Sequence, residues 1–296
     1  MDELMKTDTP GQRPGLSPIC REVPELQALA HELRKTIVTM VHKAGSGHVG
    51  GSLSVCDILT LLYFRELRVD PRRPDDTDRD RLLLSKGHAA PALYAVLAKR
   101  GYFPAEELLT LRQTGSRLQG HPDKLKVPGV EISAGSLGMG VSVGIGIALG
   151  AKKQGKTFRV WVVTGCGELD EGQNWEAFMA AKKYALDNLT VIVDYNRMQN
   201  DGSNEDIMPL GDVPGKLKAF GWNVIPCDGH DYEDLLRATE SAKAFRGGPS
   251  AIVARTIKSK GVPFMENDWS WHGKLIDDQS FERALKELEA TDPCKR

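Results

Sequence analysis

Apolar residues in this chain recur either at helical spacing or in short continuous runs. A first helix, with Gly45 as its stop, is predicted from residues at helical spacing: Leu26, Leu29, Leu33, Ile37, Met40 and Val41. Runs rich in β-branched residues predict buried strands at 160–164, 189–193 and 252–254. A loop is predicted at 263–271 and a closing amphipathic helix at 277–290. Another helix, at 173–185, is expected to carry four residues on one side: Trp175, Phe178, Met179 and Ala185.

The alternation of strands and helices predicts one α/β domain over residues 21–296. We expect a doubly wound, mainly parallel sheet with helices on both faces. No charge block or internal repeat marks a second domain. Residues 1–20 are rich in Pro, Gly and polar residues and lack periodicity, so they are expected to form a flexible tail.

A glycine-flanked turn at Gly165 and Gly167 follows the first predicted strand. Glycines allow close approach of the backbone to a ligand, and the start of the next helix favours negative charge, so a diphosphate is expected here. The second strand ends near Asn196. Because the carboxyl ends of parallel strands meet at one edge of a sheet, Asn196 and Cys166 can converge on one ion. A Gly-x-Gly turn alone, however, is common in α/β proteins.

Composition excludes several classes of partner. The chain has 296 residues, of which 41% are hydrophobic, and a net charge of −1, so no polybasic surface for nucleic acid is expected. Its apolar runs are too short for a membrane helix, and no signal-peptide pattern occurs at Met1. Five scattered cysteines without metal-type spacing indicate reduced thiols, and therefore a cytoplasmic protein.

The turn and its surroundings, GELDEGQ after Cys166 and DYN at 194–196, resemble the motif of the transketolase family, whose members use thiamine diphosphate. Further segments resemble that family in the same order: AGSGHVGGSLS at 44–54, DRDRLLLSKGHAAPALYAVLA at 78–98, LQGHPD at 118–123, PGVEISAGSLGMG at 128–140 and KSKGVPFMENDWSWHGK at 258–274. A full transketolase is about twice as long. The chain therefore resembles the amino-terminal, diphosphate-binding subunit of a split transketolase, with the thiamine diphosphate-binding fold.

The resemblance implies roles for individual residues. His48, His121 and His272 would face the reacting oxygens of a ketose donor and an aldehyde acceptor, where proton transfer near neutral pH is needed. The implied cofactor-binding residues are His88, Gly135, Leu137, Gly165, Gly167, Glu168, Asn196 and His272. The implied ligands of Mg²⁺, or alternatively of Mn²⁺ or Ca²⁺, are Asn196, the carbonyl of Met198 and Cys166. His31, His42 and His230 match no motif and are interpreted as structural.

The chain departs from the family pattern at several positions. Cys166 replaces the usual metal-binding aspartate, and a protonated thiol is a poor ligand for a hard ion. Asn200 stands where an apolar residue usually lies beneath the thiazolium ring, while Val49 and Met139 replace proline and glutamine. The four retained histidines are best explained by a specialised enzyme subunit. Two alternatives remain. The chain could be a subunit of another thiamine-dependent carboligase or decarboxylase, or a non-catalytic subunit that holds a partner.

The implied partner is the carboxy-terminal, pyrimidine-binding subunit, in an α2β2 heterotetramer. In transketolases that half supplies the glutamate that activates the cofactor, and Glu171 matches a family glutamate at the subunit contact. The sequence does not distinguish three classes of acceptor: a sugar phosphate, a free aldehyde and a carrier-bound aldehyde.

Overall fold

The computed structural model describes residues 21–293. The tail predicted at 1–20 lies outside these residues, as do Cys20 and Cys294. Within the described range, no helix combines the length and the apolar character needed to cross a membrane.

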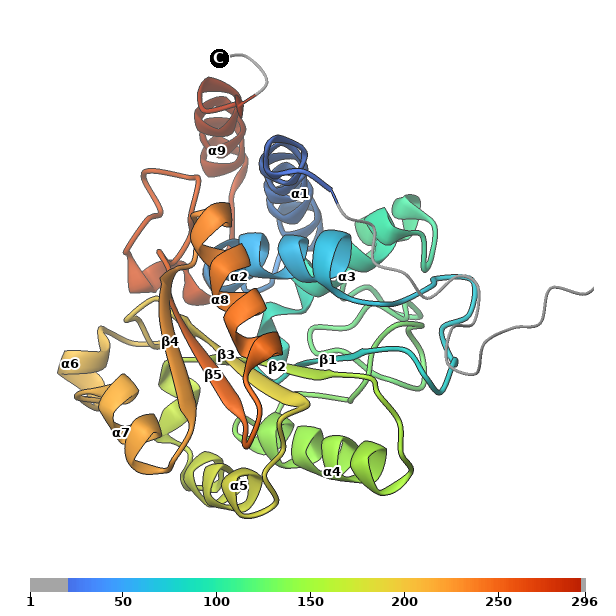
Figure 1. The fold of residues 1–296 in the computed structure, drawn as a ribbon. Helices are drawn as coiled ribbons and strands as arrows, with labels where there is room; N and C mark the ends of the chain where they lie inside the picture. Colours follow the sequence, from blue (N-terminus) through green and yellow to red (C-terminus); the bar gives the residue numbers. More distant parts are fainter. Residues whose placement is uncertain (1–20, 294–296) are drawn as a thin grey trace, which may run out of the picture.

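A five-stranded parallel sheet forms the centre of the described chain (Figure 1). Its strands are β1 (Arg81–Leu84), β2 (Val160–Gly165), β3 (Leu189–Tyr195), β4 (Asn223–Asp228) and β5 (Ser250–Arg255), in the spatial order β1-β2-β3-β5-β4. β5 therefore lies between β3 and β4, and β4 forms an edge.

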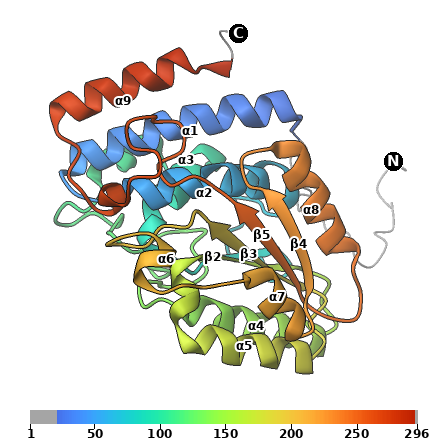
Figure 2. The same cartoon turned by 90° about the vertical axis from the view of Figure 1, so that its left-hand side faces the viewer.

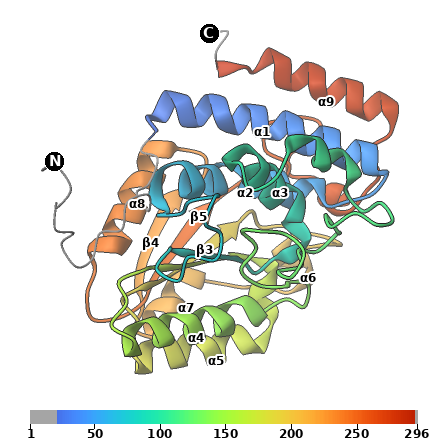
Figure 3. The same cartoon turned by 90° about the vertical axis from the view of Figure 1, so that its right-hand side faces the viewer.

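Helices cover both faces of the sheet. On one face lie α4 (Met139–Lys153), α5 (Gly172–Lys183) and α7 (Val213–Ala219), and on the other lie α1 (Val23–Ala44), α2 (Val49–Leu61), α3 (Ala90–Arg100) and α8 (Tyr232–Ala244) (Figure 2). The closing helix α9 (Asp278–Ala290) packs outside α1, while α6 (Asn204–Ile207) is a single turn after β3 (Figure 3). Figures 2 and 3 thus show helices on both sides of the sheet, which confirms the predicted doubly wound α/β fold.

Alternation along the strands explains why both faces need helices. In β2, Trp161 and Val163 belong to the hydrophobic cluster shared with α1, α2, α3 and α8, whereas Val160 and Val162 belong to the cluster shared with α4 and α5. Successive side chains of a strand point to opposite faces. A strand that is apolar on both faces is buried only between two layers of helices.

Most predicted elements agree with the structure within a few residues. Gly45 ends α1 in the left-handed conformation at φ 63°, and the predicted strands correspond to β2, β3 and β5. The prediction for 173–185 was partly wrong. Met179 is 55% exposed, and Ala185 lies beyond α5 in a left-handed turn at φ 46°, because α5 faces the sheet with Ala177, Phe178 and Ala181 instead. The predicted loop at 263–271 runs into a 3₁₀ turn, Trp269–His272.

Candidate active site

The candidate site lies at the carboxyl ends of the central strands. Gly165 of β2 pairs with Asp194 of β3, so the turn after β2 and the loop after β3 leave the sheet side by side. A pocket of about 240 Å³ opens there. Its lining contains nine of the residues predicted from sequence: His88, Leu137, Gly165, Cys166, Gly167, Glu168, Asn196, Met198 and His272. The structure therefore brings together segments that are more than 180 residues apart in the chain.

Four histidines from four separate segments gather beside this pocket, and two of them, His88 and His272, line it. The ring centroids of His48, His88 and His272 lie 5.0–5.3 Å from one another, and His121 lies 6.3 Å from His48. His48 precedes α2, His88 lies in the 3₁₀ turn Gly87–Ala89, and His272 ends the turn after β5. His121 is exposed, and Gly135 lies beside it. The sequence-based grouping of these four side chains is thus reproduced in space.

The histidines form a cluster of neutral rings. Burial, with Arg112 as the next cause, lowers the pKa of His48 to about 4, and the same two causes lower the pKa of His121, whose ring is only partly buried. Burial and the nearby Lys258 lower the pKa of His272 to about 3, and burial with Lys86 holds the pKa of His88 well below its usual value. At neutral pH each ring can therefore accept a proton at one nitrogen and donate from the other.

Lys258 is a pocket residue that sequence reasoning missed. Its ammonium donates to the carbonyl of Gln199 at 2.6 Å and to Nδ1 of His272 at 2.9 Å. An ammonium can only donate, so Nδ1 of His272 must accept, and the ring proton resides on Nε2. Burial lowers the pKa of Lys258 to about 8, which leaves it mostly charged at neutral pH.

A second buried lysine, Lys86, also lines the pocket and was not predicted. It pairs with Asp194, whose carboxylate further accepts hydrogen bonds from Ser54 at 2.5 Å and from Thr256. Lys86 also donates to the carbonyl of Gly51 at 2.9 Å. Asp194 is therefore committed to internal partners, although it stands next to the pocket.

Glu168 is buried, and its carboxylate is likewise engaged. It accepts hydrogen bonds from Ser85, from the Gly138 N–H at 2.9 Å and from the Gly165 N–H at 3.0 Å. Burial raises its pKa. The side chain is thus directed to the protein, and only the backbone of Glu168, in the 3₁₀ turn Gly167–Asp170, stays available to a ligand in the pocket.

Cys166 and Asn196 converge, as their positions after β2 and β3 predict. The Cys166 thiol lies 3.6 Å from Oδ1 of Asn196 and 3.7 Å from Oδ1 of Asn204, a second amide that the sequence did not single out. Burial raises the pKa of the thiol. The same Asn196 oxygen accepts the N–H of Met198 at 3.0 Å. Cys166 is therefore a protonated thiol at neutral pH, and its one S–H faces two neutral amide oxygens.

These residues fit an anionic cofactor better than they fit a metal ion. Lys258 and the glycine turn offer positive charge and close backbone approach, which suit a diphosphate. Over residues 21–293, no group of three or more His, Cys, Asp or Glu is placed to hold a metal. Asn196 and the carbonyl of Met198 supply two neutral oxygens, so an ion here would need the charges of the diphosphate as well.

The structure also shows where the turn before α4 lies, and where the other residues lie that depart from the family pattern. Gly138 caps α4 in the left-handed conformation at φ 82°, where an added Cβ would lie 2.8 Å from Cβ of Glu171. Asn200 lines the pocket, but its side chain is exposed and donates to Asp201 at 2.8 Å. Val49 is buried in α2, and Met139 is exposed at the start of α4.

The histidines interpreted as structural have local partners away from the pocket. His42 stacks on Phe281 at 4.1 Å, and His31 lies 3.8 Å from Asp292. His230 bonds Asp57 at 2.7 Å.

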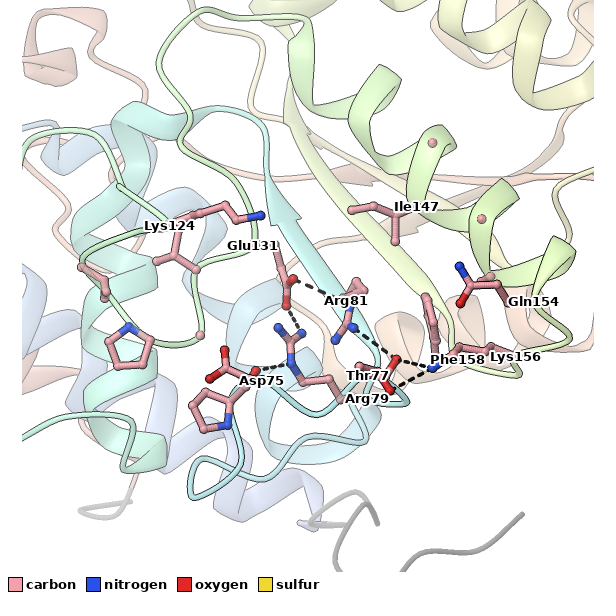
Figure 4. A pocket seen from close by; sticks show the side chains of 18 residues that line it. Asp75, Thr77, Arg79, Arg81, Lys124, Glu131, Ile147, Gln154, Lys156 and Phe158 are labelled. Carbon is pink, nitrogen blue, oxygen red and sulfur yellow. Dashed lines mark hydrogen bonds and ion pairs between the residues drawn. The ribbon is translucent and has the colours of Figure 1, made fainter. Parts of the chain in front are cut away.

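A wider cavity of about 630 Å³ lies near the amino ends of β1 and β2, away from these groups (Figure 4). Arg79 and Arg81 both pair there with Glu131, and Lys156 pairs with Asp78. Its charges are thus largely balanced within the protein.

Comparison with known proteins agrees with this geometry. The family described as "Transketolase, thiamine diphosphate binding domain" matches residues 26–295. The 6-deoxy-6-sulfo-D-fructose transketolase subunit SqwG of Clostridium sp. (strain MSTE9) is 44% identical over 265 residues, which cover 90% of this chain and 96% of that protein. One of the subunits of the apulose-4-phosphate transketolase of Phocaeicola vulgatus is 40% identical over 267 residues, which cover 90% of this chain and 95% of that protein.

Full-length relatives match over less than half their length. Human transketolase is 40% identical over 272 residues, which cover 89% of this chain but 42% of that protein. The crystal structure of transketolase from Campylobacter jejuni superposes with a TM-score of 0.86 at 33% identity, covering 92% of this chain and 44% of that one.

Proposed function

Because the chain belongs to the transketolase family, through its thiamine diphosphate-binding domain, we propose that it works with a second subunit to transfer a two-carbon ketol unit. The donor is a ketose and the acceptor an aldehyde. The observation that carries this proposal is the cluster of four neutral histidines beside a pocket that contains Lys258. Thiamine diphosphate, when bound, supplies the electron sink that carbon–carbon bond cleavage requires.

The histidines divide the proton transfers between them. His48, His121 and His272 would exchange protons with the hydroxyl and carbonyl oxygens of the substrates, because imidazole side chains can act as acid or base. Lys258 keeps the proton of His272 on Nε2, so this ring donates a hydrogen bond through Nε2.

The cofactor is held from several sides. His88, Lys258 and the backbone of Gly165, Gly167 and Glu168 would bind the diphosphate, while Gly135 and Leu137 would contact the aminopyrimidine ring. Asn196 and the Met198 carbonyl would contact a divalent ion, Mg²⁺ or alternatively Mn²⁺ or Ca²⁺, with Cys166 beside it. Within residues 21–293, Asn196, Met198 and Cys166 bring no carboxylate to that corner, so we expect weak binding of the ion without the diphosphate.

The outer face of α4 is the surface that we propose for the second subunit. Met139 is 43% and Val143 36% exposed, and no charged residue occurs from Met139 to Ala151. Exposed apolar surface of this kind is typical of subunit contacts. Glu171 lies beside Gly138, at the same end of α4. Relatives that are named subunits support a two-subunit enzyme, for which we propose an α2β2 arrangement with a pyrimidine-binding subunit.

The cytoplasm is the compartment that we propose. Three cysteines of the described chain, Cys56, Cys166 and Cys227, are free and buried. Free thiols are typical of proteins that fold in a reducing compartment.

The proposal is tested by an assay of ketol transfer, after the chain is purified together with a pyrimidine-binding transketolase subunit. The donors should include a phosphorylated and a sulfonated ketose, because the split relatives are named for such sugars, and the acceptors should include a sugar phosphate, a free aldehyde and a carrier-bound aldehyde. We expect transfer that requires both subunits, thiamine diphosphate and a divalent ion. Decarboxylation of a 2-oxo acid without ketol transfer would assign the chain to another thiamine-dependent enzyme. A stable complex that binds no cofactor would show a non-catalytic subunit.

A further inference from the structure

His230 joins helix α2 to the segment that carries Lys258. Its Nδ1 lies 2.7 Å from Oδ2 of Asp57, and its Nε2 accepts the backbone N–H of Ile257 at 2.8 Å. Because Nε2 accepts, the ring proton must reside on Nδ1 and be donated to Asp57. One imidazole thus fastens the residue next to Lys258 to a buried carboxylate.

Asp57 is a rigid anchor for that contact. Burial alone would raise its pKa, but the paired guanidinium of Arg34 holds the pKa of this carboxyl below its usual value. Tyr232 donates to the other carboxylate oxygen at 3.2 Å, and Arg34 also donates to the carbonyl of Lys260 at 3.1 Å. Asp57 lies in α2, the helix that begins directly after His48.

The segment around Lys258 is held by its backbone on both sides. The Thr256 N–H donates to the Tyr195 carbonyl at 3.2 Å, and the Ser259 N–H donates to the Gly50 carbonyl at 3.0 Å. Ser259 has a left-handed φ of 63°, which is uncommon for a residue other than glycine and therefore needs such support. Between these anchors, the Ile257 N–H faces His230 while the Lys258 side chain reaches the pocket.

We propose that His230 is a positioning residue for Lys258 and, through Lys258, for the tautomer of His272. A lysine side chain has many rotamers, so its ammonium reaches both Gln199 and His272 only when its backbone is fixed. Loss of the His230 contact leaves the Ile257 N–H without its acceptor, so the peptide next to Lys258 can shift between the anchors at Thr256 and Ser259. The effect on turnover rests on the proposed function, whereas the effect on His272 does not.

The test is a histidine ¹H–¹⁵N correlation spectrum of the full chain at neutral pH, labelled in its histidines. In the wild-type chain His272 should be the Nε2–H tautomer. His230→Ala should lose this preference and give a mixture, as should Lys258→Met, the positive control. His230→Phe keeps a ring without nitrogens and should behave like His230→Ala. His230→Gln, whose amide can accept from Ile257 and donate to Asp57, should restore the wild-type tautomer.

Tyr232→Phe is the matched control, since it removes another hydrogen bond to Asp57 without affecting the Ile257 amide. It should leave His272 unchanged. With the second subunit present, His230→Ala should lower kcat by roughly 10- to 100-fold with little change in KM, the scale of a misplaced group. An unchanged His272 tautomer in folded His230→Ala or His230→Phe would overturn the proposal, even where thermal stability falls. Absence of ketol transfer by the wild-type complex would refute the proposed function alone, because the spectrum needs no cofactor.

Discussion

Replacing Cys166 by aspartate tests the altered metal corner directly. The thiol is 1% exposed and lies 3.6 Å from the Asn196 oxygen, and burial raises its pKa. It is therefore protonated at neutral pH and a poor ligand for a hard ion. An aspartate at this position would reach one bond further and add one negative charge beside Asn196.

The expected gain is that of one charge-assisted contact. Such contacts contribute about 1.5–3 kcal/mol, and repulsion from Asp194 at the same edge of the sheet offsets part of this gain. We therefore expect Cys166→Asp to tighten metal-dependent cofactor binding by about 1–3 kcal/mol, or roughly 5- to 150-fold. In the absence of metal, the new carboxylate is buried and repelled by Asp194, so the melting temperature of the cofactor-free chain should fall.

The assay is a titration of thiamine diphosphate into the two-subunit complex at several Mg²⁺ and Mn²⁺ concentrations. The wild-type complex should need more Mg²⁺ than the mutant and should bind more tightly with the softer Mn²⁺. Cys166→Asn is the matched control, because asparagine has the size of aspartate but adds a neutral oxygen instead of a charged one. Equal affinity and equal metal dependence in the wild-type and Cys166→Asp proteins would show that position 166 lies outside the metal shell.

Three further predictions concern the pocket and its partner. The isolated chain should show no ketol transfer in a coupled assay, because the glutamate that activates the cofactor is expected on the second subunit. His121→Ala should lower turnover by roughly 10²-fold, the effect of a lost proton-transfer group, with little change in melting temperature. Cofactor affinity, measured by calorimetry, should fall as the pH rises through about 8, because Lys258 then loses the charge that attracts the diphosphate. Lys258→Arg, which stays charged, should remove this alkaline loss.

Each of these results has a control or an outcome that opposes it. Ketol transfer by the chain free of any second subunit would contradict the first. For His121, the control is His42→Ala, which removes a histidine stacked on Phe281 and should keep its turnover. A stability loss that explains the whole loss of activity would instead make His121 structural. A cofactor affinity that is flat between pH 7 and about 9.5 would exclude Lys258 from the diphosphate contact.

The central strands could be predicted from sequence because they are apolar on both faces. β2, β3 and β5 are continuous apolar runs, since helices cover them on both sides. β1 and β4 gave no such signal. β1 has four residues, and β4 is an edge strand in which Pro226 and Asp228 are exposed, so neither contains a long apolar run.

The four histidines were predictable because each lies in a glycine-containing segment that resembles the transketolase family, whereas the buried residues that support them were not predictable. Lys258, His230 and Asn204 look like ordinary polar residues of loops, and Asp57 lies in an apolar stretch without a motif. Their chemistry follows from contacts made across the fold: Asp57 meets His230 over 173 residues, and Lys258 meets Gln199 over 59. In each contact, a charged or amide group forms a hydrogen bond inside the protein instead of with water. Its partner is set by the packing of α2 against the loops after β4 and β5. A substitution at His230 should therefore alter the tautomer of His272, although His230 lies outside the motifs that identify the site.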